Sequence, residues 1–305
     1  MSHEKNDFWM RERECERCFV NGGPYFFITT ENLDWMLYEN DEEFIAGTNM
    51  VAISAAKSGL IILDDVQMNN HHHFMGSGAY EVACLFADEL HLAERKFQRK
   101  VRNRSLKIWD IRIDPIKDLK QFRSLIVYID RNAYVARRDS MPTGYPWGSA
   151  SLFFNQNLRF RNPGTRFCEL GGREKRIICR SHQVDLPYHY RVLNGMILRD
   201  SFVNYKKTES LFNNANQYFS MLSKRGEADI EIAAMLGESI QIPHEEVFQI
   251  VSGWFPGYKI RELDKKTAYE AAKMMKYRLK SSNRQIVQIL NLTTEEVNRM
   301  FPVPV

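Results

Sequence analysis

Two short apolar runs with polar residues between them constrain the fold of this chain most. The first run is residues 60–66 (LIILDDV). The second run is around residues 73–75 and leads into Gly76, Ser77 and Gly78. Each run has the length of a buried strand and ends at polar or glycine residues. An aromatic and β-branched run at residues 25–30 (YFFITT) predicts a further strand. The first quarter of the chain is therefore expected to build a sheet.

Segments with helical periodicity alternate with these strands. Residues 40–57 begin with acidic side chains, continue with an apolar face and stop at Gly59. Residues 80–104 predict a long amphipathic helix, and residues 115–132 place apolar side chains at helical spacing. The order β-α-β-β-α and then a helix predicts an α+β fold, a small antiparallel sheet with helices on one face.

A chain of 305 residues is long enough for two domains. We expect an N-terminal extension at residues 1–24, an α+β domain at 25–150, a basic accessory or linking segment at 151–209 and a helical C-terminal domain at 210–305. Residues 281–301 have the sequence shape of a helix-turn-helix, with a capping signal at Thr293 or Thr294 and Glu296. A purely structural helical hairpin is the alternative.

The net charge of +4 conceals an uneven distribution. Residues 1–60 hold 5 basic and 11 acidic side chains, whereas residues 111–210 hold 18 basic and 9 acidic ones. Between residues 95 and 107 there is no acidic side chain among seven basic ones: Arg95, Lys96, Arg99, Lys100, Arg102, Arg104 and Lys107. Such a stripe can follow nucleic-acid phosphates, although a solvated helix face is an equally simple explanation.

Composition also bears on compartment and on metals. With 44% hydrophobic and 26% charged residues, the chain is neither disordered nor fibrous, and we expect no membrane span, no signal peptide and a cytoplasmic location. Five cysteines do not make a disulfide framework. Cys15 and Cys18 form half of a zinc motif, which Cys168 with Cys179 or His182 could complete, but the spacing of that second pair is poor and favours reduced thiols.

The strongest chemical signal is the run Asn70-His71-His72-His73. In a strand, His71 and His73 point to one face and His72 to the other, so the first two could bind one divalent ion. A polar strand end is the alternative. Tyr128 and Asn132 are four residues apart and share a helix face, where a hydroxyl could act as nucleophile and an amide oxygen as metal ligand. A core tyrosine is the alternative for Tyr128.

These segments, taken in order, resemble the single-tyrosine HUH nucleases, in particular the insertion-sequence and REP-associated tyrosine transposases. The resemblance covers roughly residues 25–149 and rests on YFFITT, QMNNHHHFM, the basic helix, YIDRNAYVAR and YPWGSA. The chain departs from the family at three positions: His72 replaces a bulky apolar residue, and Asn70 and Ala133 replace prolines. None of these changes removes a functional group that the chemistry needs.

The resemblance implies a ferredoxin-like HUH nuclease fold and assigns roles to residues. His71, His73 and Asn132 would hold Mg²⁺ or Mn²⁺, and Tyr128 would attack a phosphate of single-stranded DNA, forming a 5′-phosphotyrosine link. His72 would become a ligand only if the register moved by one residue, and Tyr134, a rival nucleophile, matches no catalytic position of the family. The residues expected to contact DNA are Arg95, Lys96, Arg99, Lys100, Arg102, Arg104, Arg131, Arg137 and Arg138.

The leading hypothesis from the sequence is therefore a metal-dependent endonuclease and strand transferase, a transposase acting on hairpin-containing single-stranded DNA. Two alternatives stay open: a domesticated protein that binds DNA hairpins without cutting them, and a protein that binds or processes structured RNA. DNA is the expected partner, and the chain is expected to be a monomer or homodimer.

Overall fold

A computed structural model describes residues 2–30, 36–103, 111–136, 141–180, 185–223, 244–279 and 281–302. The chain divides into two compact units, Met1–Leu222 and Ser223–Val305, and each is described by itself. Among the described residues, no helix is both long enough and apolar enough to cross a bilayer.

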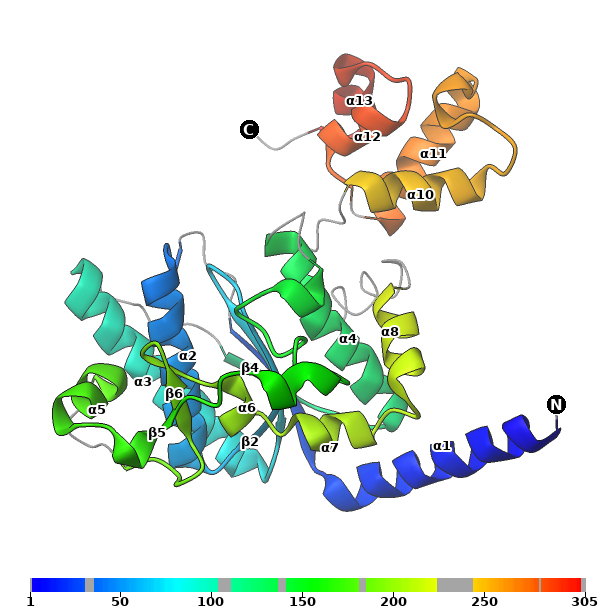
Figure 1. Cartoon of the computed structure of the whole chain (residues 1–305). Helices are drawn as coiled ribbons and strands as arrows, with labels where there is room; N and C mark the ends of the chain where they lie inside the picture. The colour runs from blue at the N-terminus through cyan, green and yellow to red at the C-terminus, as the bar shows by residue number, and fades with distance from the viewer. Residues whose placement is uncertain are drawn as a thin grey trace. The chain divides into compact units, whose positions relative to one another are not determined.

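The first unit, coloured blue to yellow in Figure 1, is built on an antiparallel sheet of four strands. Their order is β2-β3-β1-β4. The strands are β1 (Tyr25–Thr30), β2 (Ile61–Gln67), β3 (His72–Ser77) and β4 (Ile111–Pro115). Helix α2 (Asp41–Ser58) connects β1 to β2, α3 (Tyr80–Arg102) connects β3 to β4, and α4 (Leu119–Ala136) follows β4. The predicted α+β class is confirmed, with β4 as a strand that the sequence interpretation missed.

Helices cover both faces of this sheet, so the expectation of helices on one face was wrong. The ring centroids of His73 and Tyr128 on α4 are 5.5 Å apart, whereas those of Phe74 and Phe86 on α3 are 5.2 Å apart. Because neighbouring strand residues point to opposite faces, α3 and α4 lie on opposite sides of β3. The physical reason is that β1 and β3 are buried along their whole length, so both faces need a cover.

Helix α2 packs with α3 on one face of the sheet and begins and ends as its sequence predicts. The side chain of Asn40 accepts a hydrogen bond from the backbone N–H of Glu43, 3.0 Å away, which caps the helix. At the other end Gly59 has φ of 78° and donates to the carbonyl of Ala55. A left-handed residue at this position favours glycine, which explains the stop.

Residues after 150 complete the core of the first unit. Phe167, Tyr190 and Val192 belong to the same cluster of buried residues as α2. Asn49 of α2 joins this segment twice: its Nδ2 donates to the carbonyl of Gly195 at 2.9 Å, and its Oδ1 accepts from the N–H of Ile197 at 2.7 Å. The segment expected to be an accessory therefore shares its core with residues 25–150.

The other elements of the first unit are short, apart from the N-terminal helix. A second antiparallel sheet has the order β5-β6-β7. Its strands are β5 (Thr165–Arg166), β6 (Arg191–Leu193) and β7 (Met196–Ile197). The helices are α1 (Ser2–Gly22), α5 (Gly172–Cys179), α6 (Arg199–Phe202), α7 (Tyr205–Ser210) and α8 (Ala215–Ser223), with 3₁₀ turns at Pro142–Gly144, Gln156–Phe160 and Phe167–Glu169.

The second unit is helical where it is described, with α10 (His244–Trp254), a 3₁₀ turn (Ile260–Glu262), α11 (Lys265–Arg278), α12 (Asn283–Ile289) and α13 (Thr294–Met300). The last two helices agree with the two short helices predicted at residues 281–301. Ile286 and Val297 are fully buried, and the side chain of Thr293 caps α13 through the N–H of Glu296. The helical shape is thus as predicted, while DNA reading by it stays a prediction.

Candidate functional site

Strand β3 and the residue before it bring two histidines to the face covered by α4. The ring centroids of His71 and His73 are 4.8 Å apart, with an angle of 81° between the ring planes. Tyr128 of α4 follows, its ring centroid 5.5 Å from that of His73. The ring of Phe27 on β1 stacks on that of His73, with the two ring centroids 5.7 Å apart. Residues more than 50 positions apart in the chain therefore meet at one place.

Asn132 joins this group through the helix that also carries Tyr128. Its Nδ2 donates to the backbone carbonyl of Tyr128, one turn earlier, at 2.9 Å. The side chain of Asn132 also acts on the ring of His73 and favours its protonated form. Since an acceptor favours a protonated ring, the oxygen Oδ1 is the atom suited to face the imidazole.

Burial keeps His73 neutral. The side chain is fully buried, and desolvation lowers its pKa to about 3, helped by the nearby charge of His72 and opposed by the hydrogen bond with Asn132. Its Nδ1 lies 3.0 Å from the Oγ1 of Thr29, which fixes the orientation of the ring. A neutral imidazole held by a hydrogen bond at one nitrogen is the form in which histidine binds metals.

The donor set suits a divalent ion only if Asn132 takes part. Among the described residues, no group of three or more His, Cys, Asp and Glu side chains is arranged to hold a metal. Two imidazoles and one amide oxygen are three protein ligands, which leave positions for water and for a substrate oxygen. The N-terminal cysteines are placed elsewhere: Cys15 is buried, with its thiol 3.5 Å from Oδ1 of Asn213.

His72 points to the opposite face, where it has a different kind of partner. Its Nε2 lies 2.8 Å from Oε1 of Glu94 on α3, and the hydroxyl of Tyr38 donates to the same oxygen at 2.6 Å. All three side chains are buried. Burial, and then the charge of Glu94, raises the pKa of Tyr38 well above its usual value and keeps this hydroxyl a donor. Sequence reasoning missed Glu94 because it stands among the basic residues of its helix.

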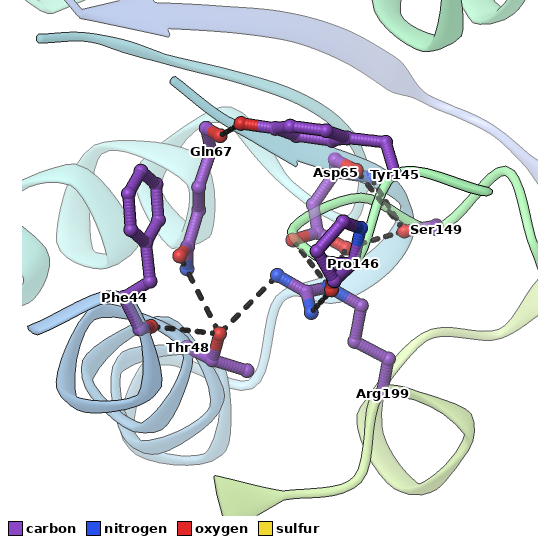
Figure 2. A network of polar contacts seen from close by, with 8 residues as sticks. All are labelled: Phe44, Thr48, Asp65, Gln67, Tyr145, Pro146, Ser149 and Arg199. Carbon is purple, nitrogen blue, oxygen red and sulfur yellow. Dashed lines mark hydrogen bonds and ion pairs between the residues drawn. The ribbon is translucent and has the colours of Figure 1, made fainter. Parts of the chain in front are cut away.

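A buried ion pair joins Arg199 and Asp65 (Figure 2). It lies on the same side of the sheet as His72, because Asp65 is opposite Phe74, two residues after His72 on β3. The Nε of Arg199 donates to both oxygens of Asp65, at 3.2 and 3.1 Å, and its Nη2 reaches Thr48 of α2 at 3.2 Å. The hydroxyl of Ser149 also donates to Asp65. Tyr145 donates to the carbonyl of Gln67 at 2.8 Å. The YPWGSA segment is thereby attached to β2, which gives Tyr145 and Ser149 a structural use.

Two further buried acids, Asp64 of β2 and Asp130 of α4, lie on the face of the sheet that α4 covers and were also missed. Burial, followed by the charges of Asp130 and Asp65, raises the pKa of Asp64 well above its usual value. Burial also raises the pKa of Asp130. The hydroxyl of Tyr218 donates to its Oδ2 at 2.7 Å and opposes this rise. For Asp64 the sequence signal was available. It is followed directly by Asp65 in an apolar strand, and two adjacent acids there are expensive to bury.

The predicted DNA-binding residues are only partly described. Four of them, Arg95, Lys96, Arg99 and Lys100, are exposed on α3, and Arg131 is half-buried on α4. Arg102 and Tyr134 belong to helices, but their side chains lie outside the described part of the structure. The predictions for Arg104, Arg137 and Arg138, and for His182 as a zinc ligand, fall outside the described residues altogether.

Comparison with known proteins gives little further guidance. No family model matches the chain, and no curated protein matches it. A solved structure of a REP-associated tyrosine transposase bound to a REP hairpin is similar over 57% of this chain and 94% of its own, with 14% identity and a TM-score of 0.33. That likeness is too weak to establish a common fold.

Proposed function

We propose that this protein is a metal-dependent nuclease and strand transferase that acts on hairpin-containing single-stranded DNA through a tyrosine of the HUH type. The observation that carries the proposal is the meeting of His71, His73, Tyr128 and Asn132 on one face of the sheet. Two imidazoles, of which that of His73 is held neutral by burial, lie beside a tyrosine and an amide. This set of side chains supports phosphoryl transfer.

The sheet itself supports the finer fold proposal. The sequence order β-α-β-β-α-β with the spatial order β2-β3-β1-β4 is that of a ferredoxin-like sheet, on which HUH nucleases are built. In this arrangement β1 and β3 are central. Of the proposed ligands, His73 lies on the central strand β3, paired with Thr29 of β1 and Val66 of β2, and His71 immediately precedes that strand.

In the proposed reaction each side chain has one task. His71, His73 and Asn132 would hold Mg²⁺ or Mn²⁺, which when bound supplies Lewis-acid polarisation of the scissile phosphate. The oxygen of Tyr128 forms a bond to phosphorus as the bond from phosphorus to the 3′ oxygen breaks, and the phenolic proton leaves to solvent. The freed 3′ oxygen takes up a proton. Tyr128 is only 1% exposed, so binding of DNA must expose its hydroxyl before attack.

The test is the covalent intermediate. Full-length protein is incubated with a single-stranded DNA hairpin and Mn²⁺, and protein–DNA adducts are measured after denaturation. We expect an adduct with the wild type and with Tyr134→Phe, which alters the rival tyrosine on the same helix, and none with Tyr128→Phe.

Two outcomes would overturn the proposal. A wild type that forms no adduct, yet binds the hairpin without metal, would be a non-cleaving binding protein. Cleavage of an RNA hairpin in place of the DNA hairpin would move the proposal to RNA processing.

A further inference from the structure

Two exposed aromatic side chains in residues 156–191 each have an arginine over the ring. Phe160 is 73% exposed, and the guanidinium of Arg159 lies 4.7 Å from its ring centroid. Tyr188 is 66% exposed, with Arg166 at the same distance from its ring and hydrogen-bonded to its hydroxyl. A single exposed aromatic side chain needs no explanation, but two such side chains, each with its own arginine over the ring, form a pattern.

The two pairs are joined by neighbouring arginines. Arg166 of β5 is opposite Arg191 of β6 in the second sheet. The Nη1 of Arg191 donates to the carbonyl of Pro163 at 3.4 Å, which joins β6 to the segment that follows Phe160. The charges of Arg161 and Arg191 also act on the same carboxylate, that of Asp200, and oppose the rise of its pKa caused by burial. The two arginine–aromatic pairs belong to one surface of the first unit.

This surface, built from residues 156–180 and 185–191, is strongly basic. It carries eight Lys and Arg residues against three Asp and Glu residues. Its exposed residues include Arg159, Arg161, Arg173 and Arg176. Such an excess attracts a polyanion, and the exposed rings offer flat apolar faces to it.

An open cleft borders the surface. Pro187 and His189, on either side of Tyr188, line a space of about 450 Å³ together with Tyr205 and Lys206. The Nζ of Lys206 lies 4.9 Å from the ring centroid of Tyr205, which repeats the pairing of cation and aromatic ring. The cleft thus adjoins the segment that carries Tyr188.

We propose that residues 156–180 and 185–191 form a stacking surface for the unpaired bases of single-stranded DNA, separate from the histidine–tyrosine site. Phe160 and Tyr188 stack bases, while the arginines neutralise the adjoining phosphates. Bases present a π-face whatever their identity, so this surface binds with little sequence preference. The choice of DNA rests on the proposed function, but the binding does not require cleavage.

The experiment measures binding of the full-length chain by fluorescence anisotropy at one fixed salt concentration. The probes are oligothymidylate and an abasic strand of equal length, which keeps the phosphates and lacks the bases. We expect the double variant Phe160→Ala/Tyr188→Ala to lose oligothymidylate affinity by on the order of tenfold or more, and abasic affinity by much less. Tyr258→Ala, which removes a ring 72% exposed in the second unit, is the matched control and leaves both affinities unchanged.

A conservative variant separates stacking from loss of structure. Phe160→Tyr/Tyr188→Phe keeps both rings and is expected to bind oligothymidylate as the wild type does. Equal losses on both probes, or no loss on either, would overturn the stacking proposal. Carrying out the same measurement in Tyr128→Phe keeps the two proposals distinguishable, because that variant lacks the adduct and is expected to retain the difference between probes.

Discussion

The two faces of β3 treat adjacent histidines in opposite ways. His73 lies against α4, where burial keeps it neutral, whereas His72 lies against α2 and α3 and contacts the carboxylate of Glu94. The same residue type is thus held neutral on one face and paired with a carboxylate on the other. Strand alternation alone makes this division, and it keeps His72 away from the proposed metal ligands.

The contrast extends beyond the histidines. On the face of α2 and α3, the charge of Asp65 is matched by that of Arg199. On the face of α4, burial raises the pKa of both Asp64 and Asp130, which favours their neutral forms. One face therefore stabilises a carboxylate by pairing it with an arginine, and the other favours the neutral form of its acids. Four predictions test this difference.

The largest effect is expected from Arg199→Met. This change leaves the carboxylate of Asp65, which has no exposed surface, buried without its cation. We expect the free energy of unfolding to fall by about 3–5 kcal/mol, measured by urea denaturation. The control is Lys57→Met, which removes an exposed ion pair with Glu89 and should cost less than about 1 kcal/mol. Equal losses would contradict the contrast between the faces.

Substitutions of the two histidines should affect different properties, adduct formation for His73 and the free energy of unfolding for His72. His73→Leu is expected to keep the fold and reduce adduct formation by on the order of a hundredfold or more, since it removes a proposed ligand. His72→Leu leaves Glu94 buried with Tyr38 as donor, so it should lose about 1–3 kcal/mol of unfolding free energy and retain the adduct at a temperature where it is folded. The reverse pattern would make His72 the ligand.

The third prediction concerns pH. The unfolded chain protonates His73 near pH 6.5, whereas in the folded chain its pKa is about 3. The stability that this residue contributes is therefore present above pH 6.5 and is lost as the pH falls toward 3. Between pH 7 and pH 5 the wild type should lose about 2 kcal/mol more than His73→Leu, measured by urea denaturation at both values. Parallel losses in the two proteins would show that His73 is not held neutral.

The smallest effect is expected from Asp64→Asn. Because burial and neighbouring acids raise the pKa of Asp64, its ionised form costs stability, and that cost grows as the pH rises through the folded-state pKa. The amide imitates the protonated acid, so the variant should be more stable at pH 7 by more than the roughly 0.5 kcal/mol of a surface change, with a gain that shrinks in acid. Asp88→Asn, on the exposed side of α3, is the control. A loss of stability at pH 7 would indicate that Asp64 acts as a carboxylate.

The sequence predicted the parts of the fold that depend on local pattern. The strand at residues 25–30, the helix that ends at Gly59 and the paired short helices near the C-terminus each carry their own periodicity or cap. β4 was missed because its alternation involves only Ile111 and Ile113. The secondary structure of the segment after residue 150 could not be predicted from the sequence. Its strands have only two or three residues and are held by distant partners such as Asn49.

For the candidate site, spacing predicted which residues share a face but not what lies opposite. Nothing near His72 in the sequence points to Glu94, which is 22 residues away and becomes a partner only when α3 packs on the sheet. The burial that keeps His73 neutral is likewise a property of the assembled layers. The roles of His71, His73, Tyr128 and Asn132 stay predictions until the adduct is measured.

The contacts of Arg199 and Ile197 have a consequence for biosynthesis. They join residues 134 and 148 positions earlier, Asp65 and Asn49, so the layer over α2 cannot close until residues near 200 have left the ribosome. A nascent chain that stops near residue 150 already contains every proposed catalytic residue, yet its Asp65 still lacks the arginine. The first unit would therefore complete its core only after the following segment has been translated.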